Sequence, residues 1–150
     1  VLQLDPQEFQ TREEFDQQAS KAFKQSHTDF IFLAGYMRIL TDSFVREWSR
    51  KIVNIHPSLL PSFRGLHPQR QAIEAGVKFS GCTVHFVTED LDAGPIIIQE
   101  VVPVLDDDDE RSLTERILKK EHAIYPEAVQ RMVKNEIKIV GQRVIYKESV

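Results

Sequence analysis

Cysteine is nearly absent from this chain, and its apolar residues form no long uninterrupted run. The single cysteine, Cys82, excludes an internal disulfide and any metal site built from several thiolates. No stretch reaches the roughly 18 consecutive apolar residues that suggest a transmembrane helix. A basic excess is missing too, because 19 lysines and arginines stand against 23 aspartates and glutamates, for a net charge of −4. We therefore expect neither nucleic acid nor a membrane as the partner of this chain.

The first residues lack the basic and then apolar pattern of a secretory signal, because they are acidic and helix-like. Cytoplasm is therefore the expected compartment. The 150 residues are 41% hydrophobic and 28% charged, which is ordinary for a globular protein. No repeat or low-complexity tract divides the sequence, so we expect one domain over residues 1–150.

Alternating apolar segments predict an α/β fold. Short β-branched and aromatic runs predict strands at 30–34, 52–55, 82–88 and 96–104, with a weaker hairpin pattern at 137–146. A helix between the first two strands would make them parallel. The third and fourth strands are separated by only seven residues, Glu89 to Pro95, which is too short for a helical crossover. That pair should therefore be antiparallel.

Amphipathic helices are predicted where apolar residues recur three and four positions apart. They cover the ranges 11–25, 42–48, 67–75 and 113–132. Thr11 with Glu14, and Ser112 with Glu115, have the spacing of capping boxes. Pro126 should kink the last helix, because proline removes one hydrogen bond of its ladder.

Two polar side chains stand at the end of the 52–55 strand. Asn54 and His56 occupy alternate positions, and Pro57 then prevents a continuing central strand. Ligands of open α/β sheets bind beyond the carboxyl ends of the strands. An amide and an imidazole there can stabilise an oxyanion and move a proton. The alternative is a strand end with a hydrogen-bonded core histidine.

A carboxylate in the 89–95 loop is the third candidate. Asp92 precedes Ala-Gly-Pro, a sequence that suits a tight loop turning inward to the same crevice. The alternative is a solvated turn. A carboxylate beside His56 would favour the imidazolium.

Other chemistries have weaker support. Ser58 lacks the pattern of a nucleophile elbow. His56, His67 and His85 lack the spacing of metal ligands, so no metal is expected. Direct transfer to a nucleophile carried by the substrate remains, with the protein supplying orientation and proton transfer.

Four segments resemble a known family, the folate-dependent formyltransferases. They are Asn54-Ile-His-Pro-Ser-Leu-Leu-Pro-Ser-Phe-Arg-Gly, Thr83-Val-His-Phe-Val-Thr-Glu-Asp-Leu-Asp-Ala-Gly-Pro, Gly35-Tyr-Met-Arg-Ile-Leu and Glu121-His-Ala-Ile-Tyr-Pro. The last two resemble the branch that serves purine synthesis. The resemblance implies transfer of a formyl group from the co-substrate 10-formyltetrahydrofolate to the amine of glycinamide ribonucleotide.

The resemblance also implies roles for individual residues. His56 would be the general acid, Asn54 would hold the formyl oxygen, and Asp92 would keep His56 protonated. The folate would contact Arg12, Met37, Arg38, Ile39, Leu40, Asn54, Thr88, Glu89, Asp90, Leu91 and Asp92. The ribonucleotide would contact Pro57, Leu118, Lys119, Lys120 and Glu121. On position alone, Arg12 and Glu121 are typical of exposed residues.

The implied fold is a Rossmann-like α/β domain with a mostly parallel sheet and an antiparallel hairpin. The family begins with a strand, a loop rich in glycine and serine, and a helix N-terminus that holds the substrate phosphate. That loop is not found in these residues. We therefore expect the C-terminal three quarters of a formyltransferase domain without its N-terminal βα portion. It would be poorly active alone, and would form a homodimer or associate with the missing segment.

Three alternative functions remain open. A formyltetrahydrofolate hydrolase would use the same three residues with water as the acceptor. A methionyl-tRNA formyltransferase would need a basic extension, which the acidic balance disfavours. A non-catalytic folate-binding remnant would bind without turnover.

Overall fold

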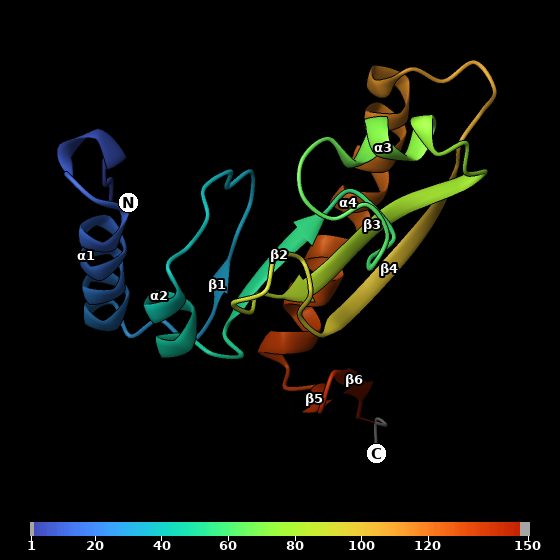
Figure 1. Ribbon diagram of the computed structural model, residues 1–150. Helices are drawn as coiled ribbons and strands as arrows, with labels where there is room; N and C mark the ends of the chain where they lie inside the picture. The colour runs from blue at the N-terminus through green and yellow to red at the C-terminus, as the bar shows by residue number, and fades with distance from the viewer. Residues whose placement is uncertain (1, 148–150) are drawn as a thin grey trace.

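A mixed six-stranded sheet runs through the molecule (Figure 1). The structure is a computed structural model that describes residues 2–147, so Val1 and residues 148–150 of the predicted domain lie outside it. The strands are β1 (Ile31–Phe32), β2 (Ile52–His56), β3 (Phe79–Phe86), β4 (Ile96–Pro103), β5 (Ile137–Val140) and β6 (Arg143–Tyr146). Their order in the sheet is β1-β2-β3-β4-β6-β5. The predicted α/β class and the terminal hairpin are confirmed.

The expectation of a mostly parallel sheet is wrong. Within residues 2–147, β1 with β2 and β4 with β6 pair in parallel, whereas the other three neighbouring pairs are antiparallel. The parallel β1–β2 pair and the antiparallel β3–β4 pair are as predicted. The antiparallel β2–β3 pair accounts for the difference, because the segment between these two strands brings the chain back in the opposite direction.

Within residues 2–147, five helices accompany the sheet. They are the 3-10 helix η1 (Pro6–Glu8) and the α-helices α1 (Arg12–Gln25), α2 (Asp42–Glu47), α3 (Pro68–Glu74) and α4 (Glu110–Val133). The capping box predicted at Thr11 is present, and its hydroxyl accepts from the Glu14 N–H at 3.1 Å. The box predicted at Ser112 with Glu115 is wrong. Asp109 caps α4 instead, because a carboxylate is a stronger acceptor and suits the positive end of the helix dipole. Pro126 lies inside α4, which continues uninterrupted to Val133.

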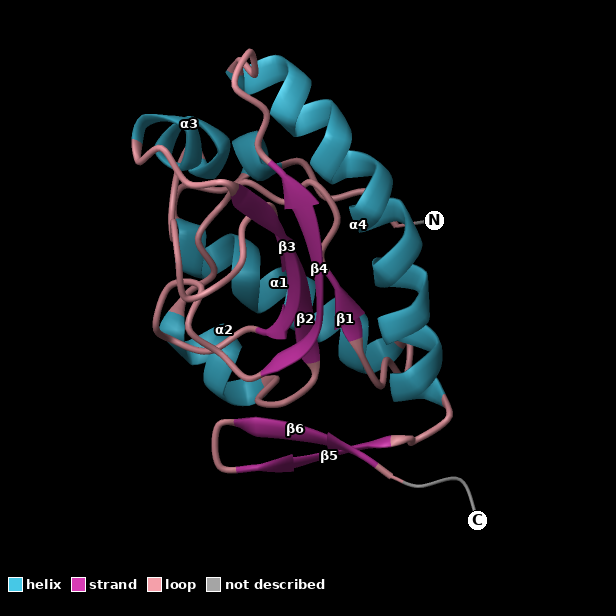
Figure 2. Ribbon diagram, turned by 90° about the vertical axis from the view of Figure 1, so that its right-hand side faces the viewer, coloured by secondary structure: helices cyan, strands magenta, loops and turns pink. Residues whose placement is uncertain are grey.

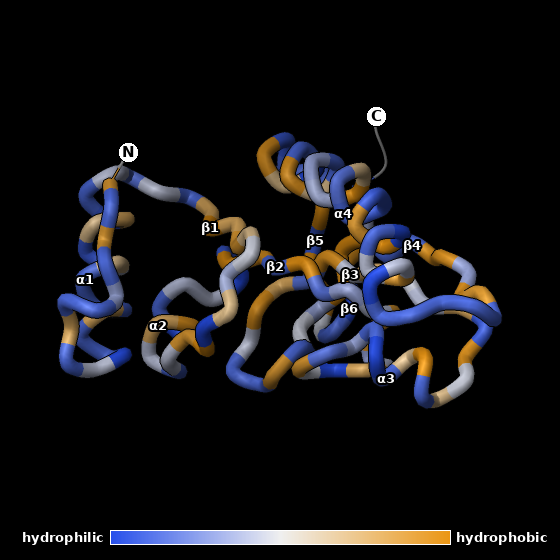
Figure 3. Tube along the Cα trace, turned by 90° about the horizontal axis from the view of Figure 1, so that it is seen from above, coloured by the Kyte–Doolittle hydropathy of each residue, from blue (hydrophilic) through white to orange (hydrophobic). Residues whose placement is uncertain are grey.

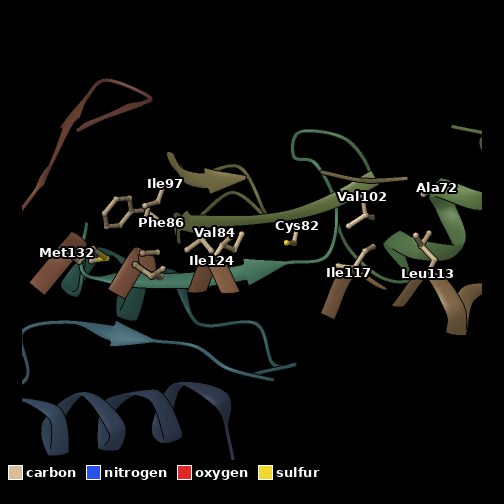
Figure 4. Close-up of a cluster of buried hydrophobic side chains, with 12 residues drawn as sticks. Ala72, Cys82, Val84, Phe86, Ile97, Val102, Leu113, Ile117, Ile124 and Met132 are labelled. Carbon is tan, nitrogen blue, oxygen red and sulfur yellow. The ribbon is translucent and has the colours of Figure 1, made fainter. Parts of the chain in front are cut away.

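The larger hydrophobic core lies between α4 and one face of the sheet. Figure 2 shows α4 alone on that side, with α1, α2 and α3 on the other. Cys82, Val84 and Phe86 of β3 point toward α4, where they meet residues such as Ile124 (Figure 4). Each fully buried aliphatic side chain contributes roughly 1.5–3 kcal/mol. This packing fixes β3, and therefore the opposite face of β3 as well.

A smaller core fills the space between β1, β2 and the helices α1 and α2. It consists of Ala19, Ile31, Phe44, Val45, Trp48 and Ile52. Ile52 and its neighbour Val53 are both 0% exposed, on opposite faces of β2. At this point the strand is thus buried on both of its faces. From above, β1 and β2 are largely hydrophobic, whereas most connecting loops are hydrophilic (Figure 3).

No helix within residues 2–147 combines the length and the hydropathy that a membrane span requires.

Candidate active site

The face of β2 that points away from α4 carries polar side chains. Asn54 and His56 share this face because side chains alternate along a strand. Across the antiparallel register, Asn54 stands opposite His85, and His56 stands opposite Thr83. The sheet therefore presents four polar residues side by side.

The imidazole of His56 lies between two oxygens that can only accept hydrogen bonds. Its Nε2 is 2.9 Å from the carbonyl oxygen of Phe63, and its Nδ1 is 3.5 Å from Oδ2 of Asp92. His56 as a whole is 7% exposed. The ring can donate to both oxygens at once only as the imidazolium. The two oxygens therefore suit an imidazole that has a hydrogen on each nitrogen.

Asp92 turns inward from the β3–β4 loop. Its backbone has a φ of +48°, a left-handed conformation that aspartate tolerates better than most residues. Its side chain is 9% exposed, and Oδ2 accepts from the Gly65 N–H at 2.9 Å. The alternative of a solvated turn is thus wrong for Asp92. The structure brings the predicted acid and carboxylate together, with Asn54 two residues away on the same face.

His85 lies next to the site. From the sequence it is considered only as a metal ligand, and its spacing does not support that role. Its Nε2 lies 3.8 Å from Oδ1 of Asp92 and, within residues 2–147, has no hydrogen-bond partner. Burial lowers the pKa of His85, against the opposing effects of the Phe86 carbonyl and the Asp92 carboxylate. The lowered pKa favours the neutral form of His85 next to Asp92. The register with Asn54 is the signal that could have identified it.

The loop 57–65 also belongs to the site, through its backbone. Phe63 supplies the carbonyl against His56, and Gly65 supplies the N–H to Asp92. Phe63 has a φ of +55°, which is rare for a bulky residue and costs about 1–3 kcal/mol. No sequence pattern indicates these backbone contacts, and neither could be predicted from the residue types.

The segment predicted to bind folate is largely exposed. Met37 is 83% exposed and Ile39 is exposed, whereas Leu40 packs against the smaller core. The Arg38 guanidinium lies 4.7 Å from the ring centre of Phe15, with one terminal nitrogen buried and unpartnered among the described residues. The exposed apolar side chains of Met37 and Ile39, with the unpartnered nitrogen of Arg38, suit an apolar ligand that has a polar edge.

Four further predicted folate residues lie in the loop before Asp92, and one lies on α1. Glu89 forms an ion pair with Arg46 of α2. Thr88 donates to the Asp90 carbonyl, and Asp90 and Leu91 are exposed. Arg12 is exposed at the start of α1, 4.0 Å from Glu13. No contact between described residues joins Arg12 to Asn54, His56 or Asp92.

Two cavities flank the loop that carries Asp92. One has a volume of about 470 Å³ and is lined by Asp92, Arg64 and Arg143, among others. The other, of about 270 Å³, is lined by residues that include Val45, Thr88 and Glu89. The first lies within the usual size range of small-molecule sites, roughly 300–1,000 Å³.

Of the residues predicted to bind the ribonucleotide, one follows β2 and the others lie on α4. Pro57 directly follows His56. Glu121 is half-buried on α4, and burial raises the pKa of its carboxyl. Burial, followed by the charge of Glu121, raises the pKa of Cys82 to about 12. No contact between described residues links Glu121 to His56.

The neighbours of Glu121 on α4 are exposed. Lys120 pairs with Glu100 at 2.9 Å, and Leu118 is 43% exposed. Lys119 is exposed as well. The substrate roles of these residues stay predictions. Across residues 2–147, no group of three or more histidines, cysteines or carboxylates is arranged to hold a metal ion.

Comparison with known proteins points to one family. A family model described as formyl transferase matches residues 1–129. The trifunctional purine biosynthetic protein adenosine-3 of Drosophila melanogaster is 53% identical over 132 residues, 88% of this chain and 10% of that protein. The phosphoribosylglycinamide formyltransferase of Escherichia coli (strain K12) is 47% identical over 118 residues, 79% of this chain and 56% of that protein. The chain therefore spans only part of these curated relatives.

Solved structures give the same picture. Glycinamide ribonucleotide transformylase 1 from Symbiobacterium toebii matches with a TM-score of 0.93 and 46% identity, over 97% of this chain and 68% of that one. A formyltetrahydrofolate deformylase from Pseudomonas syringae matches with a TM-score of 0.87 and 32% identity, over 97% of this chain and 48% of that one.

Proposed function

This chain belongs to the formyltransferase family, and we propose that it transfers a formyl group from 10-formyltetrahydrofolate to the amine of glycinamide ribonucleotide, a step of de novo purine synthesis. The observation that carries the proposal is the buried contact between His56 and Asp92, 3.5 Å apart, on the face that Asn54 shares. The names of the E. coli and S. toebii relatives support this acceptor.

The chemistry assigns each of the three residues a separate task. The amine of the ribonucleotide attacks the formyl carbon, and the carbonyl electron pair moves to the formyl oxygen. Asn54 would donate its amide hydrogen to that oxygen. When the electron pair on the oxygen re-forms the carbonyl, the bond between the formyl carbon and N10 of the folate breaks, and His56 would supply the proton that N10 takes up. The attacking amine gives up one proton, which would return His56 to its protonated form. Asp92 would stabilise the positive charge of His56 until the proton leaves.

Both substrates are small molecules, and the surroundings of the site suit them. The unpartnered Arg38 nitrogen would donate a hydrogen bond to a polar edge of the folate, and the cavity beside Thr88 would hold another part of that molecule. Half-buried Glu121 would contact the ribonucleotide. The predicted homodimer remains a proposal that sedimentation of the purified chain would test.

The deciding experiment mixes the chain with 10-formyltetrahydrofolate and follows formation of tetrahydrofolate, with and without glycinamide ribonucleotide. Formation that depends on the ribonucleotide, and that His56→Gln abolishes, supports the transfer. His67→Gln is the matched control, because His67 is an exposed histidine paired with Glu110 at 3.2 Å. Folate binding without turnover would favour a non-catalytic folate-binding protein only if turnover also stays absent when the expected N-terminal βα portion of the family is supplied as a separate segment.

Hydrolysis is the second candidate, because the deformylase of P. syringae also shares this fold at 32% identity. The distinction lies in the acceptor. A hydrolase would release formate from 10-formyltetrahydrofolate with water alone, at a rate that added glycinamide ribonucleotide leaves unchanged. That result would overturn the proposed transfer.

A further inference from the structure

One buried hydroxyl of the sheet makes two hydrogen bonds to the backbone of the loop 57–65. Thr83 of β3 is 0% exposed, and its Oγ1 donates to the carbonyl of Ser58 at 2.7 Å. The same oxygen accepts from the backbone N–H of Leu60 at 3.1 Å. One side chain thus engages both the start and the middle of the loop.

Gln99 of β4 reinforces this attachment from the next strand. Its amide nitrogen donates to Oγ1 of Thr83 and to the Leu60 carbonyl, each at 2.9 Å. The strand register places these residues side by side, because Thr83 of β3 stands opposite His56 of β2 on one side and opposite Gln99 of β4 on the other. The hydroxyl is fully engaged, with one bond donated and two accepted.

The far half of the loop carries the contacts to the site. Phe63 places its carbonyl 2.9 Å from Nε2 of His56 despite an unfavourable left-handed backbone. A carbonyl oxygen can only accept, so Nε2 must carry a hydrogen whenever this bond exists. A strained conformation persists only where its surroundings hold it. Thr83 is one of the buried side chains that hold this loop, together with Ser58, whose hydroxyl donates to the Ser62 carbonyl at 2.5 Å.

We propose that Thr83 is a positioning residue for His56: it holds the loop 57–65 against the sheet, so that the Phe63 carbonyl fixes a hydrogen on Nε2 and leaves Nδ1, on the Asp92 side, as the nitrogen that gains and loses the proton. The link from Nδ1 to formyl transfer rests on the proposed function. The fixed ring itself does not, because it follows from contacts within this chain.

The first test uses the unaltered chain labelled with 15N at its histidines. Two-dimensional NMR distinguishes the two neutral forms of an imidazole, and the His56 signals are assigned by their loss in His56→Gln. At a pH where His56 is neutral, we expect one form, with the hydrogen on Nε2. A neutral ring with its hydrogen on Nδ1 would overturn the proposal without any variant of the loop.

The second test removes the hydroxyl with little change of shape. In Thr83→Val, we expect His56 to become a mixture of the two neutral forms, and the Leu60 amide to exchange with solvent about tenfold faster, as for the loss of one ordinary hydrogen bond. Thr83→Ser, which keeps a hydroxyl, should restore both signals. Thr114→Val is the matched control, because Thr114 bonds only within α4.

Gln99→Leu gives an independent reading if Thr83→Val does not fold, because Gln99 is exposed and its loss spares the core. We expect a smaller change of the same kind at His56. Unchanged His56 signals in a folded Thr83→Val or Gln99→Leu chain would overturn the proposal. Altered signals in a chain that shows no formyl transfer would leave the positioning role standing and would contradict only the proposed function.

Discussion

At the scale of single residues, Asp92 has a conformation that serves its position in the site. Its left-handed backbone turns the carboxylate away from solvent, toward His56 and the Gly65 N–H. The charge and the shape of this side chain can be separated experimentally, because asparagine has the same outline and also tolerates a positive φ.

Asp92→Asn should therefore fold normally but slow formyl transfer by about 10²–10⁴-fold, the usual contribution of a positioned proton-transfer group. The Gly65 N–H would still have an acceptor, so folate affinity should change little. Steady-state rates and folate titration measure the two effects. Asp90→Asn, an exposed residue of the same loop, is the control. An Asp92→Asn variant with an unchanged rate and pH profile would show that the carboxylate charge is not used.

His85 makes the stability of the fold depend on pH. Burial lowers its pKa in the folded chain below the value of about 6.5 that an unfolded histidine has. As the pH falls below that value, the unfolded chain takes up a proton that the folded chain refuses, so the free energy of unfolding decreases. The neutral His85 makes its full contribution to the free energy of unfolding above about pH 6.5. That contribution decreases as the pH falls from there to the lowered pKa of His85 in the folded chain.

We expect urea unfolding to show this decrease between pH 7.5 and pH 5.5, and His85→Gln to show less of it. His122→Gln is the control, because His122 is an exposed histidine on α4. Equal pH dependence in the unaltered chain and in His85→Gln would contradict the assignment to His85.

At the scale of elements, the loop between β3 and β4 depends on a close backbone approach. A Cβ added at Gly94 would lie 1.8 Å from the Phe86 carbonyl oxygen and 2.8 Å from its carbon. Both are backbone atoms of β3 that cannot rotate away. The loop that carries Asp92 closes only because Gly94 has no side chain.

Gly94→Ala should lower the free energy of unfolding by about 1–3 kcal/mol or more, because overpacking against a fixed backbone is not relieved. Chemical denaturation measures the change. Gly76→Ala is a useful comparison, because its φ is +67° but nothing lies within 4 Å of an added Cβ. The backbone strain at Gly76 should cost about 1–2 kcal/mol without any clash. Gly94→Ala at unaltered stability would mean that the loop shifts freely.

Local signals in the sequence predicted the elements better than their pairing. The capping box at Thr11 depends on four adjacent residues and was correct, as was the antiparallel β3–β4 pair with its short connection. The parallel contact of β4 with β6 joins distant segments through one residue pair, Ile96 with Arg143, and has no local signal.

The site divides in the same way. His56 and Asp92 could be predicted from a strand end and a tight loop, and the structure places them 3.5 Å apart. The Phe63 carbonyl could not, because its position depends on a left-handed backbone at a bulky residue. A contact made by the backbone of a strained loop cannot be predicted from the residue type, because every residue has the same backbone carbonyl.

At the scale of the whole molecule, β2 joins the two cores. Ile52 faces the core that contains Trp48, and its neighbour Val53 faces the core of α4. The Tyr125 hydroxyl of α4 donates to the carbonyls of Leu33 and Val53, which ties the helix to the β1–β2 pair. Asn54 and His56 continue the same strand, so disturbance of either core should reach the site.

Leu113→Ala tests this coupling. Leu113 is 0% exposed in the core of α4, and its truncation should cost about 2–5 kcal/mol, a large part of the roughly 5–15 kcal/mol that stabilises a domain. Trp48, the single tryptophan, reports on the other core through its fluorescence. If β2 makes the two cores one cooperative unit, the fluorescence and far-UV circular dichroism midpoints should fall together.

Val133→Ala, at a 68% exposed position of the same helix, should leave both nearly unchanged. A Leu113→Ala chain in which circular dichroism shifts while the Trp48 transition stays in place would mean that the two cores unfold separately, and that β2 does not transmit the stability of α4 to the side of the molecule that carries α1 and α2.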